Sequence, residues 1–148
     1  MLMSILILVG VFLLAMAIID IKYRKIPSFF LTAMILLLII VNIHQGPALL
    51  SFGIAGFVFA WLLYDFDYIR GIADVKALTI VSLTVSTLVQ FAILMVIIGM
   101  VGLMYQLVAL RFLNKEVKNI KDFFKFRDEV PFIPAIFIVY IIFWILFL

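Results

Sequence analysis

The sequence contains no cysteine and a single histidine, His44. Without cysteine the chain can form neither disulfides nor thiolate metal sites. One histidine alone at the end of a predicted helix cannot supply the His or Cys cluster that holds zinc. We therefore expect neither a metal nor a cofactor.

Charged side chains are also scarce, at 13% of the residues, whereas 69% are hydrophobic. A soluble domain has about 25% charged and about 45–50% apolar residues, and it needs polar side chains to cover its surface. We therefore expect this chain to be surrounded by a lipid bilayer. The net charge is +3, but the basic residues flank apolar runs, which indicates membrane topology rather than a nucleic-acid partner.

The apolar runs predict an all-α, polytopic membrane protein with six transmembrane helices in one domain, 1–148. A span needs roughly 20 mostly apolar residues. The long run Ala77–Leu110 exceeds one span, and we divide it around Ser86–Gln90, where polar side chains gather. We expect the first span to be retained, because it lacks a basic n-region and is too long for a signal h-region. The expected spans are 2–19, 29–43, 48–64, 74–87, 90–111 and 131–148.

The charges predict the orientation of these spans. All 11 basic and all 8 acidic residues fall between spans one and two, three and four, or five and six. Lys and Arg mark the cytoplasmic side, so we expect both termini outside and the charged face in the cytoplasm, at the plasma membrane. The last charged loop, Arg111–Glu129, is compatible with an amphipathic helix on the membrane surface and equally with a solvated linker.

Two aspartates at helix ends are the candidates for chemistry. With His44 on the opposite side from the charged face, peptide hydrolysis without metal or cysteine leaves a pair of carboxylates. One is ionised to activate water and the other is protonated to donate to the carbonyl oxygen; two carboxylates held close together cannot both ionise easily. Asp20 closes the first span and Asp74 opens the fourth, both at the cytoplasmic boundary. Acids at such positions are functional candidates, or alternatively boundary charges paired with Lys22 or Lys76.

The residues around Asp74 favour the functional interpretation. Gly71 and Ala73 are small, and small residues let helices approach closely. Asp74 is then expected to pack against another helix rather than to extend into water. It also lies near a helix N-terminus, which favours an anion.

The stretch Gly71-Ile72-Ala73-Asp74-Val75-Lys76 resembles the G-x-G-D-x-K motif of type IV prepilin peptidases and archaeal preflagellin peptidases, the GxGD membrane aspartic peptidases. The stretch Asp20 to Pro27 resembles the family's other motif, an aspartate closing helix one and Ile-Pro opening helix two. Glu129 to Pro134 resembles the last helix of archaeal members, so the resemblance runs over the whole chain.

The resemblance implies an aspartic endopeptidase that removes the basic leader of prepilin-like or preflagellin-like proteins at the cytoplasmic membrane face. It makes Asp20 and Asp74 the catalytic pair. Gly71 matches the motif glycine, Lys76 matches the motif lysine, and Pro27 matches the proline that opens helix two. The role of Lys76 stays open between structural and electrostatic.

The sequence departs from the family pattern at two positions. Ala73 replaces the second motif glycine and would be strained if its φ were positive. Ser28 follows Pro27 where asparagine is usual. The chain also lacks the cysteine-bearing cytoplasmic region of members that methylate the new N-terminus, so we expect peptidase activity without methyltransferase activity.

Asp65 and Asp67 have two interpretations. They lie in a solvated turn, or they attract the basic leader of the substrate. Two other functions also remain open. A small transporter or channel needs polar residues near the bilayer midplane, which the spans largely lack. A non-catalytic membrane scaffold subunit would tolerate loss of either aspartate. The substrate stays open among preflagellins, pilins and pilin-like proteins, and the oligomeric state stays open as well.

Overall fold

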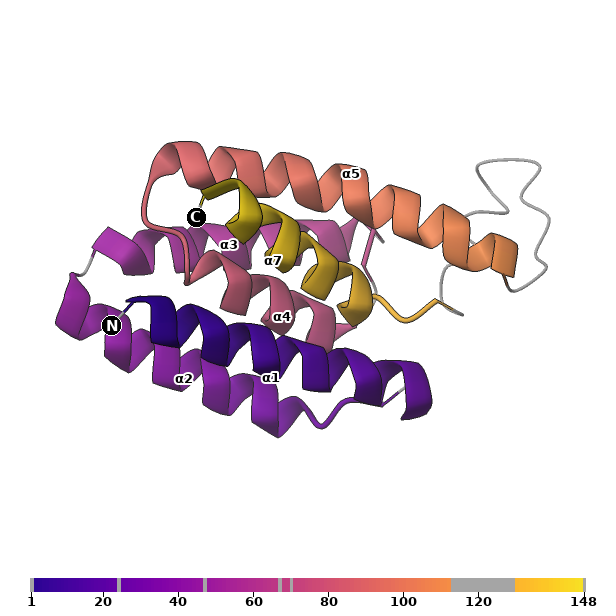
Figure 1. Cartoon of the computed structure of the whole chain (residues 1–148), viewed down its shortest axis with the longest axis horizontal. Coiled ribbons are helices and arrows are strands. Elements are labelled where there is room, and N and C mark those ends of the chain that lie inside the picture. Colours follow the sequence, from indigo (N-terminus) through magenta and orange to yellow (C-terminus); the bar gives the residue numbers. More distant parts are fainter. Residues whose placement is uncertain are drawn as a thin grey trace.

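The computed structural model is an all-helical bundle, and the described residues are 2–23, 25–46, 48–66, 68–69, 71–112 and 130–147. Consecutive helices run in opposite directions, and both ends of the chain lie at the same end of the bundle (Figure 1). The predicted all-α class is confirmed. The helices are α1 (Leu2–Tyr23), α2 (Ser28–Gln45), α3 (Ala48–Asp65), α4 (Ile72–Ser82), α5 (Leu88–Phe112) and α7 (Ile133–Phe147).

Three of the described helices, α1, α2 and α5, are long and apolar enough to cross a membrane. Their outward-facing side chains are large and apolar: Ile7, Ile40 and Met104 are each more than half exposed. Water would solvate such a surface poorly, whereas lipid tails match it. The long apolar helices therefore suggest that the protein associates with a membrane.

The fourth predicted span, 74–87, is wrong in its length. Helix α4 has 11 residues, and at about 1.5 Å per residue it covers roughly half of the hydrocarbon thickness. It is the most enclosed helix, with every residue from Ala77 to Ser82 buried, and it packs against α1, α2, α3 and α7. Backbone at membrane depth need not be helical where protein surrounds it, so neighbouring helices permit α4 to end early.

The predicted break between the fourth and fifth spans is confirmed, as a turn over residues 83–87. The Asn42 side chain donates a hydrogen bond of 2.9 Å to the Leu83 carbonyl, which ends α4. The Thr87 hydroxyl accepts the Gln90 amide at 3.2 Å, and the Gln90 side chain accepts the Ser86 amide at 3.1 Å, which starts α5. The polar residues that marked the break in the sequence satisfy helix ends.

The last turn of α4 lies unusually close to α3. A Cβ built on Gly56 would overlap the Ser82 side chain, and one on Gly53 would overlap the side chain of Leu83. Glycine allows two helix backbones to approach each other in this way. This contact fixes the position of α4 against α3 at the end of the helix that is remote from the charges.

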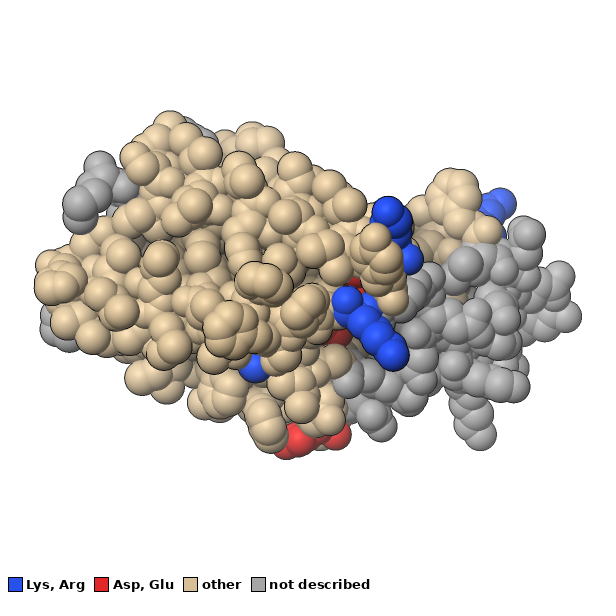
Figure 2. All heavy atoms as spheres, turned by 90° about the horizontal axis from the view of Figure 1, so that it is seen from below, with Lys and Arg blue, Asp and Glu red and all other residues tan. Residues whose placement is uncertain are grey.

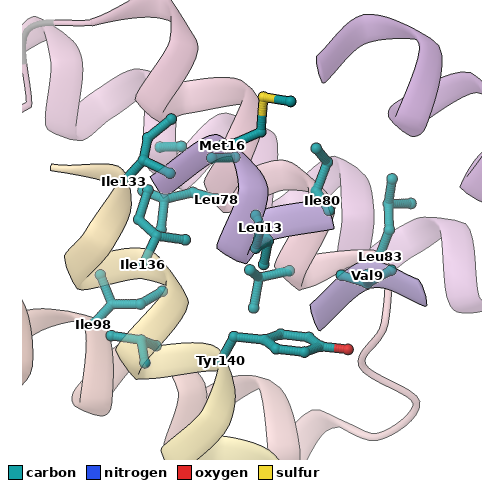
Figure 3. Packing of buried hydrophobic residues seen from close by; sticks show 14 of the residues in the cluster. Val9, Leu13, Met16, Leu78, Ile80, Leu83, Ile98, Ile133, Ile136 and Tyr140 are labelled. Carbon is teal, nitrogen blue, oxygen red and sulfur yellow. The ribbon is translucent and has the colours of Figure 1, made fainter. Parts of the chain in front are cut away.

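A buried apolar cluster joins α4 to α1 and α7 (Figure 3). The Tyr140 hydroxyl on α7 donates a 2.7 Å hydrogen bond to the Leu6 carbonyl on α1. The packing therefore holds the end of α1 beside the beginnings of α4 and α7. The labelled members of the cluster are Val9, Leu13, Met16, Leu78, Ile80, Leu83, Ile98, Ile133, Ile136 and Tyr140.

Candidate active site

The described charged residues gather at one end of the bundle, where α1, α3 and α5 end and α2, α4 and α7 begin. His44 lies near the end of α2, at the opposite end of the bundle. On the face drawn in Figure 2, the visible charged side chains lie away from the end that carries the two termini. The clustering that the sequence predicts is therefore present among these residues, which are Asp20, Lys22, Lys25, Asp65, Asp74, Lys76 and Arg111.

Asp20 lies in the last turn of α1, where its side chain is half-buried. Its Oδ2 accepts a hydrogen bond of 3.2 Å from the backbone N–H of Ile133, the first residue of α7. The carboxylate thus points away from lipid and toward the N-terminus of a neighbouring helix. The apolar packing between α1 and α7 holds this contact in place.

Asp74 lies in the first turn of α4 and is also half-buried. Its backbone N–H donates to the Gly71 carbonyl at 2.9 Å, which starts the helix. A Cβ on Gly71 would lie 2.8 Å from Asp74 Oδ2. Gly71 has an extended backbone (φ −100°, ψ 127°) that any residue adopts, so the site needs glycine for the space it leaves beside the carboxylate.

The fold brings Asp20 and Asp74 together. Their carboxylates are near enough for the negative charge of Asp20 to act on Asp74. One comes from the end of α1 and the other from the beginning of α4, two helices in direct contact. Two carboxylates at this separation repel each other when both are ionised, which favours one shared proton.

Lys76 bridges α4 to the beginning of α2. Its Nζ donates hydrogen bonds to the Ser28 hydroxyl and, at 2.8 Å, to the Thr32 hydroxyl. The Thr32 hydroxyl in turn donates to the Ser28 carbonyl at 3.0 Å. The amine therefore points toward α2, and these contacts favour a structural role over neutralisation of Asp74.

The remaining motif residues have simple positions. Ala73 lies within the right-handed first turn of α4 and packs against the apolar cluster. The strain expected from a positive φ does not arise, because a helical backbone suits alanine. Pro27 precedes α2 with φ −66°, and its carbonyl accepts the Phe30 amide at 3.1 Å.

The two candidate leader-binding residues are only partly placed. Asp65 is the last residue of α3 and is exposed. Asp67 lies outside the described residues. The same holds for residues 113–129, on which the two interpretations of the last charged loop depend.

Sequence reasoning missed three groups at this site, namely the Ile133 amide and the hydroxyls of Ser28 and Thr32. Pro131 and Pro134 bracket the start of α7. Proline is common at helix beginnings, where backbone N–H groups lack intrahelical partners. Ser28 and Thr32 are four residues apart, which places them on one helix face. These signals indicated a free amide and a polar stripe, but not the residues that they contact.

Comparison with known proteins assigns no family to these residues. No protein-family model, no curated protein and no solved structure matches the chain. Among the described residues, no three His, Cys, Asp or Glu side chains gather as a metal site would require. The chemistry is therefore inferred from the pair of aspartates and their immediate contacts.

Proposed function

We propose that this protein is a membrane aspartic endopeptidase of the GxGD kind. It cleaves the leader peptide of prepilin-like or preflagellin-like proteins at the cytoplasmic membrane face, without methyltransferase activity. The observation that carries the proposal is the meeting of Asp20 and Asp74 at the charged end of an otherwise apolar bundle. Gly71 leaves space for one carboxylate, and the beginning of α7 binds the other.

The proposed topology has six crossings of the plasma membrane, both termini outside and the charged end in the cytoplasm. Helices α1, α2 and α5 have the length for this, while α3 and α7 are shorter apolar helices. The fourth crossing is completed by the turn over residues 83–87, whose first three residues are buried in protein. The location of Lys and Arg at one end supports the cytoplasmic assignment of that end.

The two carboxylates supply both proton transfers of peptide hydrolysis. The ionised carboxylate takes a proton from water, whose oxygen attacks the scissile carbonyl carbon. The protonated carboxyl donates its proton to the carbonyl oxygen, which gives a neutral tetrahedral intermediate. The C–N bond then breaks as the leaving nitrogen takes a proton from the site. No metal is needed for this sequence of steps.

The proposed substrate suits the two surfaces of the protein. An apolar helix of a prepilin-like substrate lies in the bilayer beside the bundle, and its basic leader extends into the cytoplasm. Asp65 is exposed at the charged end, where an acidic side chain attracts a basic segment. In this proposal Asp67 contributes in the same way.

The test is cleavage of prepilin-like and preflagellin-like substrates in membranes that carry the wild type, Asp20→Asn or Asp74→Asn. We expect each substitution to lower the rate by at least about 10²-fold, because each removes one proton-transfer group. Asp65→Asn is the matched control, since it removes an acid from the same end outside the pair, and we expect it to weaken cleavage only modestly.

Protein levels are compared by immunoblot, so that loss of activity is separated from loss of protein. Cleavage that survives either substitution at Asp20 or Asp74 would overturn the two-aspartate mechanism. Failure of the wild type to cleave any of the substrates would favour the non-catalytic scaffold. The transporter alternative loses support because Asn42, Thr87 and Gln90 bind helix ends.

A further inference from the structure

The environments of the two aspartates differ in one respect that bears on their roles. Asp20 Oδ2 accepts a backbone N–H at the very start of α7. The first amides of a helix have no intrahelical acceptor, and together they carry a partial positive charge. A hydrogen bond to the ionised form of a carboxyl favours that form. The beginning of α7 therefore stabilises a negative charge on Asp20.

The geometry of α7 directs this amide at Asp20. The Phe132 carbonyl accepts the amides of Ala135, at 3.0 Å, and Ile136, at 3.2 Å, which closes the first helical turn. The Ile133 amide lies ahead of this turn and is left to donate outward. The Ile133 side chain is fully buried, so the backbone at this position is held firmly against α1.

Asp74 has contacts of another kind. Its carboxylate lies against Gly71 Cα and faces the negative charge of Asp20. Lys76, the nearest basic residue in sequence, binds the hydroxyls of Ser28 and Thr32. A proton on Asp74 removes the repulsion between the two carboxylates without disturbing the bond from Ile133 to Asp20.

We propose, on the premise that the protein is the peptidase described above, that Asp20 is the ionised general base and Asp74 the protonated general acid. The backbone amide of Ile133 is the positioning group that sets this order. Asp20 therefore activates the water, and Asp74 donates to the carbonyl oxygen of the substrate.

Few other described titratable groups lie near Asp20. Helix α1 itself carries Lys22, and α4, which packs against it, carries Asp74 and Lys76. The described part of α7 carries Tyr140, whose hydroxyl binds the Leu6 carbonyl. Because Tyr140 lies two helical turns along α7 from Ile133, it does not compete for the Asp20 carboxylate.

The first experiment measures the order of titration without any substrate. Infrared spectra of the purified protein in lipid are recorded against pH for Asp74→Asn, which leaves Asp20, and for Asp20→Asn, which leaves Asp74. The protonated carboxyl C=O band should disappear at a lower pH in Asp74→Asn than in Asp20→Asn. The reverse order would overturn the assignment, whether or not the protein cleaves a leader peptide.

The second experiment removes the amide itself. Ile133→Pro eliminates the N–H at a first helical position, where proline is tolerated. Ile133→Ala keeps the N–H and loses side-chain packing, so it is the matched control. We expect Ile133→Pro to move the acid limb of the cleavage–pH profile upward by about one pH unit, with its alkaline limb in place, and we expect Ile133→Ala to move neither limb.

Each outcome of this second experiment is informative. Movement of the alkaline limb alone would exchange the two roles. Movement in Ile133→Ala equal to that in Ile133→Pro would show a packing effect and would overturn the amide as positioning group. If Ile133→Pro does not fold, the single-aspartate titrations decide the assignment. Absence of cleavage by the wild type would reject the proposed function, while the infrared order would still be measured.

Discussion

The two ends of α4 differ in almost every physical respect. The first turn is only partly buried, carries Asp74 and Lys76, and contacts α1 and α2 through polar atoms. The last turn is fully buried, and its hydroxyls bond back into the helix, Thr79 to the Val75 carbonyl at 2.8 Å and Ser82 to the Leu78 carbonyl at 3.0 Å. One short helix thus separates chemistry from anchoring, so substitutions at its two ends should have different consequences.

The largest effect that would test this division is expected from Gly71→Ala. A Cβ at position 71 would lie 2.8 Å from Asp74 Oδ2, so the carboxylate must move. Because a misplacement of about 1 Å can cost about 10²-fold in rate, we expect cleavage to fall by up to that factor. The free energy of unfolding should change little, since the extended backbone at this position accepts alanine. Cleavage rate and unfolding in detergent are measured together.

Ala73→Gly is the control for this substitution. It changes the same pair of residue types in the opposite direction, two positions away, and it restores the motif glycine. We expect cleavage to stay near the wild-type rate and stability to fall by about 0.5–1 kcal/mol, because glycine is unfavourable within a helix. Equal losses of activity in both variants would mean that the turn as a whole, rather than the space beside Asp74, controls the site.

The other end of α4 is tested by Gly56→Ala. The added methyl would overlap the Ser82 side chain, and overpacking of this kind costs about 1–3 kcal/mol. We expect a loss of that size in the free energy of unfolding, with the fraction of protein that remains folded still active. Gly99→Ala is the matched control, because a Cβ there meets no atom within 4 Å. A large loss of activity in folded Gly56→Ala would show that the two ends of α4 are coupled.

Much of the fold could be predicted because composition and charge act locally along the chain. The helices, their single charged end and the break near Ser86–Gln90 depend on residues that are contiguous in sequence. The early end of α4 could not be predicted in this way. It depends on enclosure by four other helices and on the contact between Gly56 and Ser82, and neither is visible in the hydropathy of the segment itself.

The candidate site divides along the same line. Asp20 and Asp74 could be predicted as a pair because both stand at helix ends on one side of the chain and both belong to recognisable motifs. The partner of Asp20 on α7 could not be, since it is a backbone amide, and every residue except proline carries one. Only the packing of α7 against α1 selects the amide of Ile133.

The smallest expected effect concerns Lys76, which belongs to the chemical end of α4 by position but to the anchoring function by its contacts. Lys76→Met removes the hydrogen bonds to Ser28 and Thr32. We expect a loss of about 1 kcal/mol in the free energy of unfolding, at the low end for bonds to a charged group because the side chain is partly exposed. The cleavage rate should fall less than tenfold.

A double-mutant cycle of Lys76→Met with Thr32→Val separates structural from electrostatic action. If Lys76 anchors α4 to α2, the two substitutions are not additive in unfolding, with a coupling of at least about 0.5 kcal/mol. If Lys76 instead acts on the charges of Asp20 and Asp74, Lys76→Met moves the cleavage–pH profile and Thr32→Val leaves it unchanged. The first result would make the motif lysine part of the support for the catalytic turn. The second would place it among the groups that set the protonation of the aspartates.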